Sequence, residues 1–489
     1  MMSGSRKSDL RHTRAAASLA VGFLFLLAAA CPRGAIAEAP AATQAAKRPN
    51  VLFIAIDDLN DWVGCLGGHP QVKTPNIDRL ARRGVLFTNA HCQAPICNPS
   101  RVSLLTGRLP SSTGVYQLSP NFRSDAKLKN LVTLPQHFAA AGYETLGVGK
   151  IFHGRYPDTI SFQTNGPRPG FGPRPKKKIN YLTGHALWDW GAFPEKDSQM
   201  GDAKVADWTI EQLRAGHARP FFLAVGFYRP HVPLYVPQKW LDLYPEGSVR
   251  LPPTKEGDRD DLPEFAKKLT NGLPAPRHEW FVENHQWRRA VAAYLASVTF
   301  VDNQLGRVLD ALDASGAADN TVVVLFSDHG WHLGEKFRWA KRSLWERSTR
   351  VPMIVVAPGR TRDEKCSRPV GLVDLYPTLI ELCGLPPREG LDGHSLAPLV
   401  ASPQSARREP AITTYEQNNH AVRSEHWRYI RYADGSQELY DHRRDPNEWN
   451  NLAGDEKYAD VIAQHARWIP KVNAAPVLGS IDSAAKKSR

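Results

Sequence analysis

The feature that most constrains the fold is a continuous apolar run, Asn50–Ile56, that ends in two aspartates. A strand covered on one face alternates apolar and polar residues, whereas a run without alternation is typical of a strand buried on both faces of a parallel sheet. Two later runs, Phe221–Phe227 and Thr321–Phe326, have the same character. We therefore expect a sheet whose two faces are both covered.

Helical stretches separate these strand-like runs. One begins at Thr74-Pro75 and ends at Gly84, with apolar residues spaced for a single helix face. Three more helices and two more strands are predicted at Val132–Ala141, Trp287–Leu312, Val373–Leu382, Tyr143–Val148 and Val351–Val356. This alternation predicts an α/β fold with a mainly parallel central sheet and helices on both faces.

Two stretches interrupt the alternation. Gly154–Asp202 is rich in Pro, Gly, Lys and Trp, and Pro245–Arg277 is rich in Pro and charged residues. Both exceed the usual length of a connection between elements, so we expect functional surface loops.

The pattern changes again from about Pro410. Short strand-like pieces at Ala411–Tyr415, Trp427–Tyr432 and Gln437–Tyr440 precede a helix after Lys457. We predict a smaller C-terminal α+β subdomain over residues 410–480, joined by the Ser402–Glu409 linker to a larger domain over residues 48–401. A chain of 489 residues has room for two or three domains.

Residues 1–37 have the pattern of a secretory signal peptide. The basic residues Arg6, Lys7, Arg11 and Arg14 precede the apolar stretch Ala15–Ala30, and Ala35 and Ala37 mark a cleavage site. That stretch is short for a membrane-spanning helix, which needs about 20 residues, and no later segment approaches that length, so we expect no stable membrane insertion. We expect export to the periplasm or secretion. A lipoprotein anchor at Cys31 is the less favoured alternative, because the usual Leu three positions earlier is missing.

Charge and cysteine content narrow the class further. The formal net charge of +13 is a mild, diffuse excess, compatible with an anionic substrate but not indicative of nucleic-acid binding. Five cysteines follow the signal peptide: Cys65, Cys92, Cys97, Cys366 and Cys383. Because five is odd, an exported chain leaves at least one unpaired or uses one in chemistry. Whether Cys366 pairs with Cys383 stays open.

Two strand ends carry candidate metal ligands. Asp57-Asp58 follows the first buried run, and Asp328-His329 follows the run that starts at Thr321. Ligands of open α/β sheets lie beyond the carboxyl ends of strands. One such pair alone is compatible with a solvated turn or a helix cap, but three crowded carboxylates repel one another unless a cation neutralises them. Oxygen-rich ligation favours Ca²⁺ or Mg²⁺.

Cys97-Asn98-Pro99-Ser100-Arg101 is the most informative segment. Proline two positions after the cysteine is tolerated at a helix start, so Cys97 is expected near a helix N-terminus, which favours anions. Arg101, one turn on, is expected to reach the same anion. A Cys92–Cys97 disulfide, a buried thiol and a plain thiolate nucleophile remain alternatives at this point.

Cys97-x-Pro99-Ser100-Arg101 followed by Thr106-Gly107-Arg108 resembles the signature of the sulfatase family. The resemblance runs from about Arg48 to Gly393, and further matching motifs are Asp57-Asp58, Thr74-Pro75-Asn76-Ile77-Asp78, Gly149-Lys150, Ser327-Asp328-His329-Gly330, Leu439-Tyr440-Asp441 and Asp445-Pro446. It implies that a maturation enzyme oxidises Cys97 to formylglycine, whose hydrated aldehyde attacks sulfur and expels an alcohol. The second hydroxyl then eliminates sulfate. The modification of Cys97 also accounts for the odd number of cysteines.

The resemblance also implies a role for each site residue. Asp57, Asp58, Asp328, His329 and the modified residue 97 match the ligands of one metal ion, usually Ca²⁺ and less often Mg²⁺. Arg101 matches the residue that holds the diol, and Lys150 and Lys341 match the sulfate-binding lysines. His153 matches the histidine that assists the second step, and His231 matches the proton donor to the leaving oxygen.

Within the family, the motifs resemble most the iduronate-2-sulfatase branch, which implies a 2-O-sulfated iduronate or related uronic acid as substrate. Gly149-Lys150-Ile-Phe-His153 has the spacing of that branch. Lys336 stands where relatives usually carry histidine, so the rim of the pocket is expected to differ. In the long loop, Lys176–Lys178 with Trp188 and Trp190 suit an anionic sugar or, alternatively, are a solvated charge run and core aromatics. The rival functions are hydrolysis of another sulfated glycan or small sulfate ester, a phosphodiesterase or phosphonate monoester hydrolase of the same fold, and an inactive glycan-binding protein.

Overall fold

The computed structural model describes residues 48–154, 158–182, 184–271, 275–360 and 362–479. The predicted signal peptide and Cys31 lie outside these residues. The described residues group into one compact unit. Among the described residues, no helix is both long enough and apolar enough to span a membrane.

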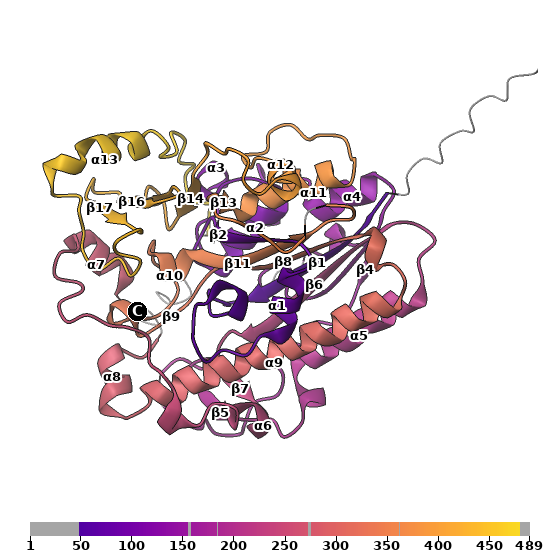
Figure 1. Cartoon of the computed structure of the whole chain (residues 1–489), viewed down its shortest axis with the longest axis horizontal. Coiled ribbons are helices and arrows are strands. Elements are labelled where there is room, and N and C mark those ends of the chain that lie inside the picture. Colours follow the sequence, from indigo (N-terminus) through magenta and orange to yellow (C-terminus); the bar gives the residue numbers. More distant parts are fainter. Residues whose placement is uncertain (1–47, 155–157, 183, 272–274, 361, 480–489) are drawn as a thin grey trace, which may run out of the picture. The chain divides into compact units, whose positions relative to one another are not determined.

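A central sheet organises the described part of this unit (Figure 1). Its strand order is β12-β2-β11-β8-β1-β6-β3-β4, with β13 paired to β2. The strands are β1 (Asn50–Asp57), β2 (Val85–His91), β3 (Glu144–Gly149), β4 (Thr164–Asn165), β6 (Phe221–Pro230), β8 (Thr321–Ser327), β11 (Arg350–Val356), β12 (Glu364–Cys366) and β13 (Val370–Gly371). Only β11 runs antiparallel to its neighbours, β8 and β2, within this described sheet. The predicted mainly parallel sheet is confirmed.

The two faces of β1 show why the apolar run does not alternate. All eight residues are buried. Leu52, Ile54 and Ile56 enter one hydrophobic cluster, and Val51, Phe53 and Ala55 enter the other. Because successive side chains of a strand point to opposite faces, a strand between two cores has to be apolar throughout.

Helices cover both faces, as predicted (Figure 1). The cluster that contains Leu52 includes residues of α1 (Pro75–Ala81), α5 (Gly201–Ala215) and α9 (Trp287–Ala314). The cluster that contains Val51 includes residues of α2 (Cys97–Thr106), α4 (Leu134–Ala140), α11 (Leu375–Leu382) and α12 (Ala397–Ala401).

A smaller antiparallel sheet follows, in the order β14-β15-β16-β17. Its strands are β14 (Ala411–Thr414), β15 (His420–Arg423), β16 (Trp427–Arg431) and β17 (Gln437–Asp441), and α13 (Ala459–Ala466) comes after them. Val422, Tyr429 and Leu439 pack with residues of α13 on one face. This sheet confirms the α+β character expected after Pro410, although β15 was not predicted. The division at residues 402–409 stays a prediction.

The two long stretches differ from each other. The part of Gly154–Asp202 that the structure describes is mostly irregular and includes the short strand β5 (Trp190–Ala192). Asp189 organises it by accepting hydrogen bonds from the amides of Ile179, Asn180 and Tyr181. Pro245–Arg277 was expected to be a loop, but it contains α7 (Glu264–Thr270). That expectation was wrong because Ala266 and Leu262, apolar residues in a charged segment, pack against the C-terminal sheet.

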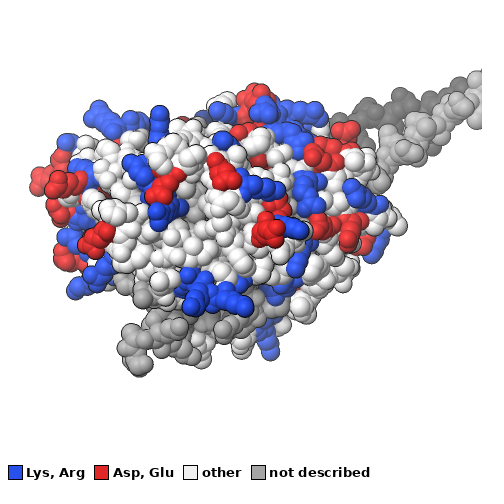
Figure 2. Space-filling model, turned by 90° about the horizontal axis from the view of Figure 1, so that it is seen from below, with Lys and Arg blue, Asp and Glu red and all other residues white. Residues whose placement is uncertain are grey.

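Surface charge of both signs is mixed on the face in Figure 2, where Lys and Arg lie among Asp and Glu. The net positive charge is therefore not gathered into one field over that face.

Candidate active site

Two pairs of polar residues meet at the carboxyl ends of β1 and β8. These strands are parallel neighbours, and Ile56 pairs with Ser327, so the residues that follow lie at one edge. The Asp58 amide donates to Asp328 Oδ1 at 3.2 Å. Asp57, Asp58, Asp328 and His329 are all fully buried. The predicted meeting of the two pairs is observed.

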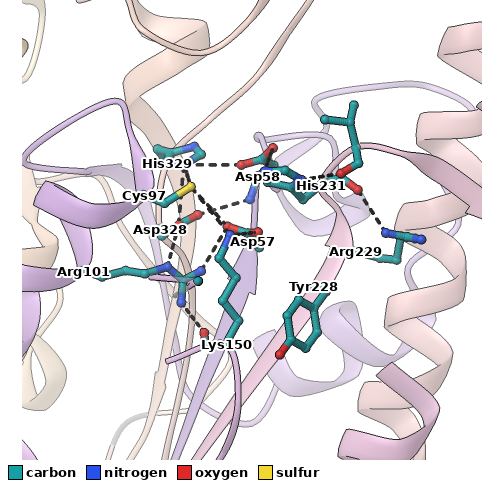
Figure 3. A network of polar contacts seen from close by, with 12 residues as sticks. Asp57, Asp58, Cys97, Arg101, Lys150, Tyr228, Arg229, His231, Asp328 and His329 are labelled. Atoms are coloured by element: carbon teal, nitrogen blue, oxygen red, sulfur yellow. Dashed lines mark hydrogen bonds and ion pairs between the residues drawn. The ribbon is translucent and has the colours of Figure 1, made fainter. Parts of the chain in front are cut away.

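Cys97 is the first residue of α2 and is buried beside these residues (Figure 3). Its Sγ lies 3.2 Å from His329 Nε2 and 3.7 Å from Asp57 Oδ1. Cys92 and Cys97 are both free thiols, as are Cys366 and Cys383. The structure therefore contains neither the Cys92–Cys97 nor the Cys366–Cys383 disulfide.

Four of the predicted metal ligands lie close enough together to hold one cation. Asp57, Asp58, Cys97 and His329 each offer one ligand atom, and these atoms lie within 4.8 Å of one another. Asp58 Oδ2 is buried and has no hydrogen-bond partner within the described part of the chain. A buried carboxylate oxygen without a donor is costly unless a positive charge meets it, so this orphaned oxygen supports a metal site.

Arg101 fixes the carboxylates. Its Nε donates to Asp328 Oδ2 at 2.8 Å, and its Nη2 donates to Asp57 Oδ1 at 3.1 Å. Its Nη1 donates to the carbonyls of Lys150 and Ile151. The hydrogen bonds of Arg101 thus go to candidate metal ligands and to backbone.

Two lysines flank the Cys97 sulfur. Lys150 follows β3, and its Nζ lies 3.7 Å from Sγ and forms an ion pair with Asp57. Lys341 follows β10 (Trp339–Ala340), and its Nζ lies 3.2 Å from Sγ and 2.5 Å from Asp58 Oδ1. Both lysines are buried.

The buried charges shift the pKa values of the site. Burial alone would raise the pKa of Asp57, but Lys150 and the other cations around it hold that pKa well below its ordinary value. Burial raises the pKa of Asp58 to about 7 despite Lys341. Burial opposes ionisation of Cys97, yet Lys150 and Lys341 lower the pKa of its thiol. The pocket therefore favours an anion at position 97.

Two histidines lie at the border of this cluster. His231 follows β6; its Nε2 is 3.8 Å from Asp58 Oδ2, and its Nδ1 is 2.5 Å from the Val232 carbonyl. Burial and Lys341 depress its pKa strongly. His153 Nδ1 is buried and has no hydrogen-bond partner among the residues that the structure describes, and burial and Lys150 lower the pKa of His153 to about 3. The structure thus places all the predicted site residues close enough together for their charges to influence one another.

Some contacts were not foreseen. Phe171, in the long irregular stretch, stacks on His231 with ring centroids 4.7 Å apart. Arg229 donates to the carbonyls of both residues. The only sequence signal was a phenylalanine between two glycines, Gly170 and Gly172, and nothing in the spacing indicates which strand end it reaches.

The aromatic and basic residues of the long stretch 154–202 lie in different environments. Trp188 stacks on Trp331, whose ring centroid lies 6.4 Å from that of His231. Trp190 is a core aromatic, because it packs on Phe281 and donates to Gln286. Lys176 and Lys177 are exposed.

Lys336 does not lie against the Cys97 sulfur. It is buried, and its Nζ lies 3.0 Å from Asp258 Oδ1 and donates to the Glu448 carbonyl. Lys336 belongs to the segment after β9 (His332–Leu333). Its contact with Glu448 links this segment to the C-terminal region, and its observed contacts do not include the candidate metal ligands.

Comparison with known proteins decides the family. A family model described as Sulfatase matches residues 49–385. The chain belongs to the sulfatase family. Sulfatases are hydrolases of sulfate esters, and the buried cations around Cys97 suit an anionic ester. A second model, described as N-sulphoglucosamine sulphohydrolase, C-terminal, matches residues 334–474 and includes the small sheet.

Individual relatives agree with this assignment. A sulfatase of Formosa agariphila is 43% identical over 443 residues, covering 87% of each chain. The iduronate 2-sulfatase of Mus musculus is 35% identical over 423 residues, covering 75% of this chain and 74% of that protein. Among solved structures, a 2-O GAG sulfatase has 26% identity and a TM-score of 0.67, covering 86% of this chain and 91% of its own. The phosphonate monoester hydrolase of Agrobacterium radiobacter shares the fold, with 24% identity and a TM-score of 0.72, covering 86% and 94% of the two chains.

Proposed function

We propose that this sulfatase acts on sulfated carbohydrates and that residue 97 supplies its nucleophile. The observation that carries the proposal is the position of Cys97 Sγ, 3.7 Å from Lys150 Nζ and 3.2 Å from Lys341 Nζ in a buried pocket. Two ammonium groups beside one reactive atom suit a substrate whose reacting group is an oxyanion.

A divalent cation fits beside this atom. Asp57, Asp58, Asp328, His329 and residue 97 would hold it, and the oxygen-rich set favours Ca²⁺ over Mg²⁺ because Ca²⁺ accepts more ligands in less regular geometry. When bound, such a cation polarises an oxyanion and favours ionised ligands. In its absence, Lys150, Lys341 and Arg101 balance the three carboxylates. A divalent cation therefore makes the pocket net positive and suited to a sulfate ester.

We propose that Cys97 is converted to formylglycine by a maturation enzyme. The hydrated aldehyde supplies a hydroxyl nucleophile that a thiol does not. Lys150 and Lys341 bind the sulfate oxygens and stabilise the charge that develops there. Arg101 holds Asp57 and Asp328 in place through its hydrogen bonds at 3.1 and 2.8 Å.

His231 gives a proton to the leaving oxygen as the bond between sulfur and that oxygen breaks. Its Nδ1 contacts the Val232 carbonyl at 2.5 Å, which leaves Nε2 to face the pocket. Burial and Lys341 depress the pKa of His231 in the free protein, and a bound anionic ester raises that pKa again because it adds negative charge nearby. His153, whose Nδ1 meets no hydrogen-bond partner among the described residues, assists release of sulfate in the second step.

For the substrate we propose the 2-O-sulfate of iduronate or a related uronic acid. The similarity to iduronate 2-sulfatase supports this class of substrate. The exposed Lys176 and Lys177 suit the carboxylates of neighbouring sugars in such a substrate. We further propose that the protein is exported, to the periplasm or beyond. Residues 48–401 would then form the catalytic domain and residues 410–480 the C-terminal subdomain.

A panel of substrates tests the proposal. The protein, matured with a formylglycine-generating enzyme and loaded with Ca²⁺, is assayed on 2-O-sulfated and 6-O-sulfated disaccharides and on an aryl phosphate diester. We expect release of sulfate with kcat/KM highest on the 2-O-sulfated uronide. A preference for the 6-O-sulfate contradicts the substrate class, and a preference for the phosphate diester contradicts the reaction.

A further inference from the structure

One side chain of the long irregular stretch reaches the proposed proton donor. The Phe171 ring stacks on the His231 imidazole, with centroids 4.7 Å apart and planes at 23°. The rings of Tyr228 and Phe171 make a T-shaped contact, with centroids 5.5 Å apart and planes at 75°. Lys150 Nζ lies 5.8 Å from the centroid of the same ring. Phe171 therefore touches the donor on its face and lies beside a sulfate-binding group.

The guanidinium of Arg229 hydrogen-bonds to the backbone carbonyls of both Phe171 and His231. Arg229 is fully buried, and Figure 3 shows it beside His231. Its Nη1 donates to the His231 carbonyl at 3.1 Å, and its Nη2 donates to the Phe171 carbonyl at 3.0 Å. Its Nε donates to the Tyr235 carbonyl at 3.1 Å. The distance between the two backbones is thus fixed by a rigid planar group.

Glycines fix the position of the Phe171 backbone. Gly170 and Gly172 have φ values of +66° and +81°, which residues with a Cβ rarely adopt. A Cβ on Gly201, at the start of α5, would lie 2.0 Å from the Gly170 carbonyl oxygen. The segment 170–172 therefore sits against α5 in a way that only glycine at these positions allows.

We propose that Phe171 is a positioning residue for His231. The flat ring holds the imidazole plane, while the Val232 carbonyl holds Nδ1, so that Nε2 meets the leaving oxygen. This inference rests on the proposed function. As the S–O bond breaks, its electron pair goes to the leaving oxygen, and the proton of Nε2 joins that oxygen. A tilted imidazole loses this transfer without losing the sulfate-binding lysines.

The consequence depends on the leaving group. A sugar alkoxide or phenolate needs the proton in the transition state, whereas a nitrophenolate leaves readily without it. General acid catalysis contributes about 10²–10⁴-fold to a rate. Removing the flat ring is therefore expected to lower kcat by about 10–100-fold on phenyl sulfate, a part of that contribution. The expected change on 4-nitrophenyl sulfate is less than about 3-fold.

The experiment compares kcat for a series of aryl sulfates that differ in leaving-group pKa. The variants are Phe171→Leu, Phe171→Met, which keeps more of the apolar volume without a flat ring, and Phe171→Tyr, which keeps the ring. Phe193→Leu is the matched control, because Phe193 belongs to the same stretch but packs on Tyr235, with centroids 6.2 Å apart. Thermal unfolding of every variant accompanies the kinetics.

We expect a steeper dependence of log kcat on leaving-group pKa in Phe171→Leu and Phe171→Met, the wild-type slope in Phe171→Tyr, and an unchanged slope in Phe193→Leu. An equal loss on every ester, or no loss, overturns the positioning role. Failure of the proposed function is distinguishable, because the wild type itself would then release no sulfate from any ester of the series.

Discussion

Replacing Lys341 by methionine should weaken catalysis but strengthen cation binding. Lys341 Nζ lies 2.5 Å from Asp58 Oδ1 and 3.2 Å from Cys97 Sγ, so one ammonium group serves both the candidate metal ligand and the nucleophile. Methionine keeps the length and the apolar packing of the side chain. The change therefore removes one positive charge and leaves Asp58 buried without that partner.

The distances set the magnitudes. Two unit charges 2.5 Å apart attract with roughly 7 kcal/mol at an effective dielectric constant of about 20. Desolvation offsets part of this, and breaking a buried ion pair costs about 3–5 kcal/mol. We expect a loss of stability of up to that size in the cation-free protein above pH 7, because burial raises the pKa of Asp58 to about 7 and the ion pair is complete only where Asp58 is ionised. With Ca²⁺ bound the loss should be smaller, because the cation compensates Asp58 in place of the lysine. By the same linkage, Ca²⁺ should bind roughly 10–100-fold more tightly to the variant.

The assay measures the midpoint of thermal unfolding with EDTA and with saturating Ca²⁺, and the Ca²⁺ dissociation constant by calorimetry, for wild type and Lys341→Met. The kcat/KM on an aryl sulfate should fall by about 10²–10³-fold, as for loss of one oxyanion-stabilising donor. Lys127→Met is the control for a lysine that is exposed. Weaker Ca²⁺ binding by Lys341→Met, or an equal loss of stability with and without Ca²⁺, would refute the reasoning.

Three further predictions use other parts of the molecule. Cys97→Ser should release no measurable sulfate after maturation in a host whose enzyme acts on cysteine only, yet keep the wild-type fold by circular dichroism; wild-type turnover by this variant would contradict a modified residue 97. The double variant Lys176→Gln/Lys177→Gln should raise KM for a sulfated oligosaccharide several-fold at low salt and leave KM unchanged at high salt, because salt screens interactions between exposed charges. The control is Lys127→Gln/Lys129→Gln. A change in KM that does not depend on salt would contradict this prediction. Burial raises the pKa of Asp302 to about 6. In the unfolded chain this carboxyl has its ordinary pKa of 3.8. Between pH 3.8 and 6 the folded protein therefore holds a proton that the unfolded chain has lost. The resulting contribution to stability is full below pH 3.8 and disappears as the pH rises through 6. Relative to Asp302→Asn, the wild type should lose about 2–3 kcal/mol between pH 4 and 7 in urea unfolding; a constant difference would refute this.

The sheet and the meeting of the candidate metal ligands were predictable because both depend on local pattern. The uninterrupted run of β1 requires cover on both faces, and parallel strands bring their carboxyl ends to one edge. Once β1 and β8 are neighbours, Asp57-Asp58 and Asp328-His329 have to meet. The start of α2 at Cys97 followed from the proline at position 99.

Other features depend on contacts between distant residues that no local pattern encodes. The sequence shows Phe171 in a loop rich in proline and glycine, but its place on His231 depends on Arg229 and on the close approach of Gly201. The helix α7 was missed because its apolar residues pack on a sheet about 150 residues further along the chain. Lys336 pairs with Asp258, which only the fold brings near.

The central claim is that residue 97 becomes the nucleophile of a sulfate-ester hydrolase, and peptide mass spectrometry tests it most directly. The protein is produced in a host that is known to mature a control sulfatase. The tryptic fragment Gly84–Arg101 contains both Cys92 and Cys97. We predict a mass loss that corresponds to replacement of CH₂SH by CHO at residue 97, with Cys92 intact. An unmodified thiol at residue 97, in a preparation where the control sulfatase is fully converted, would contradict the account.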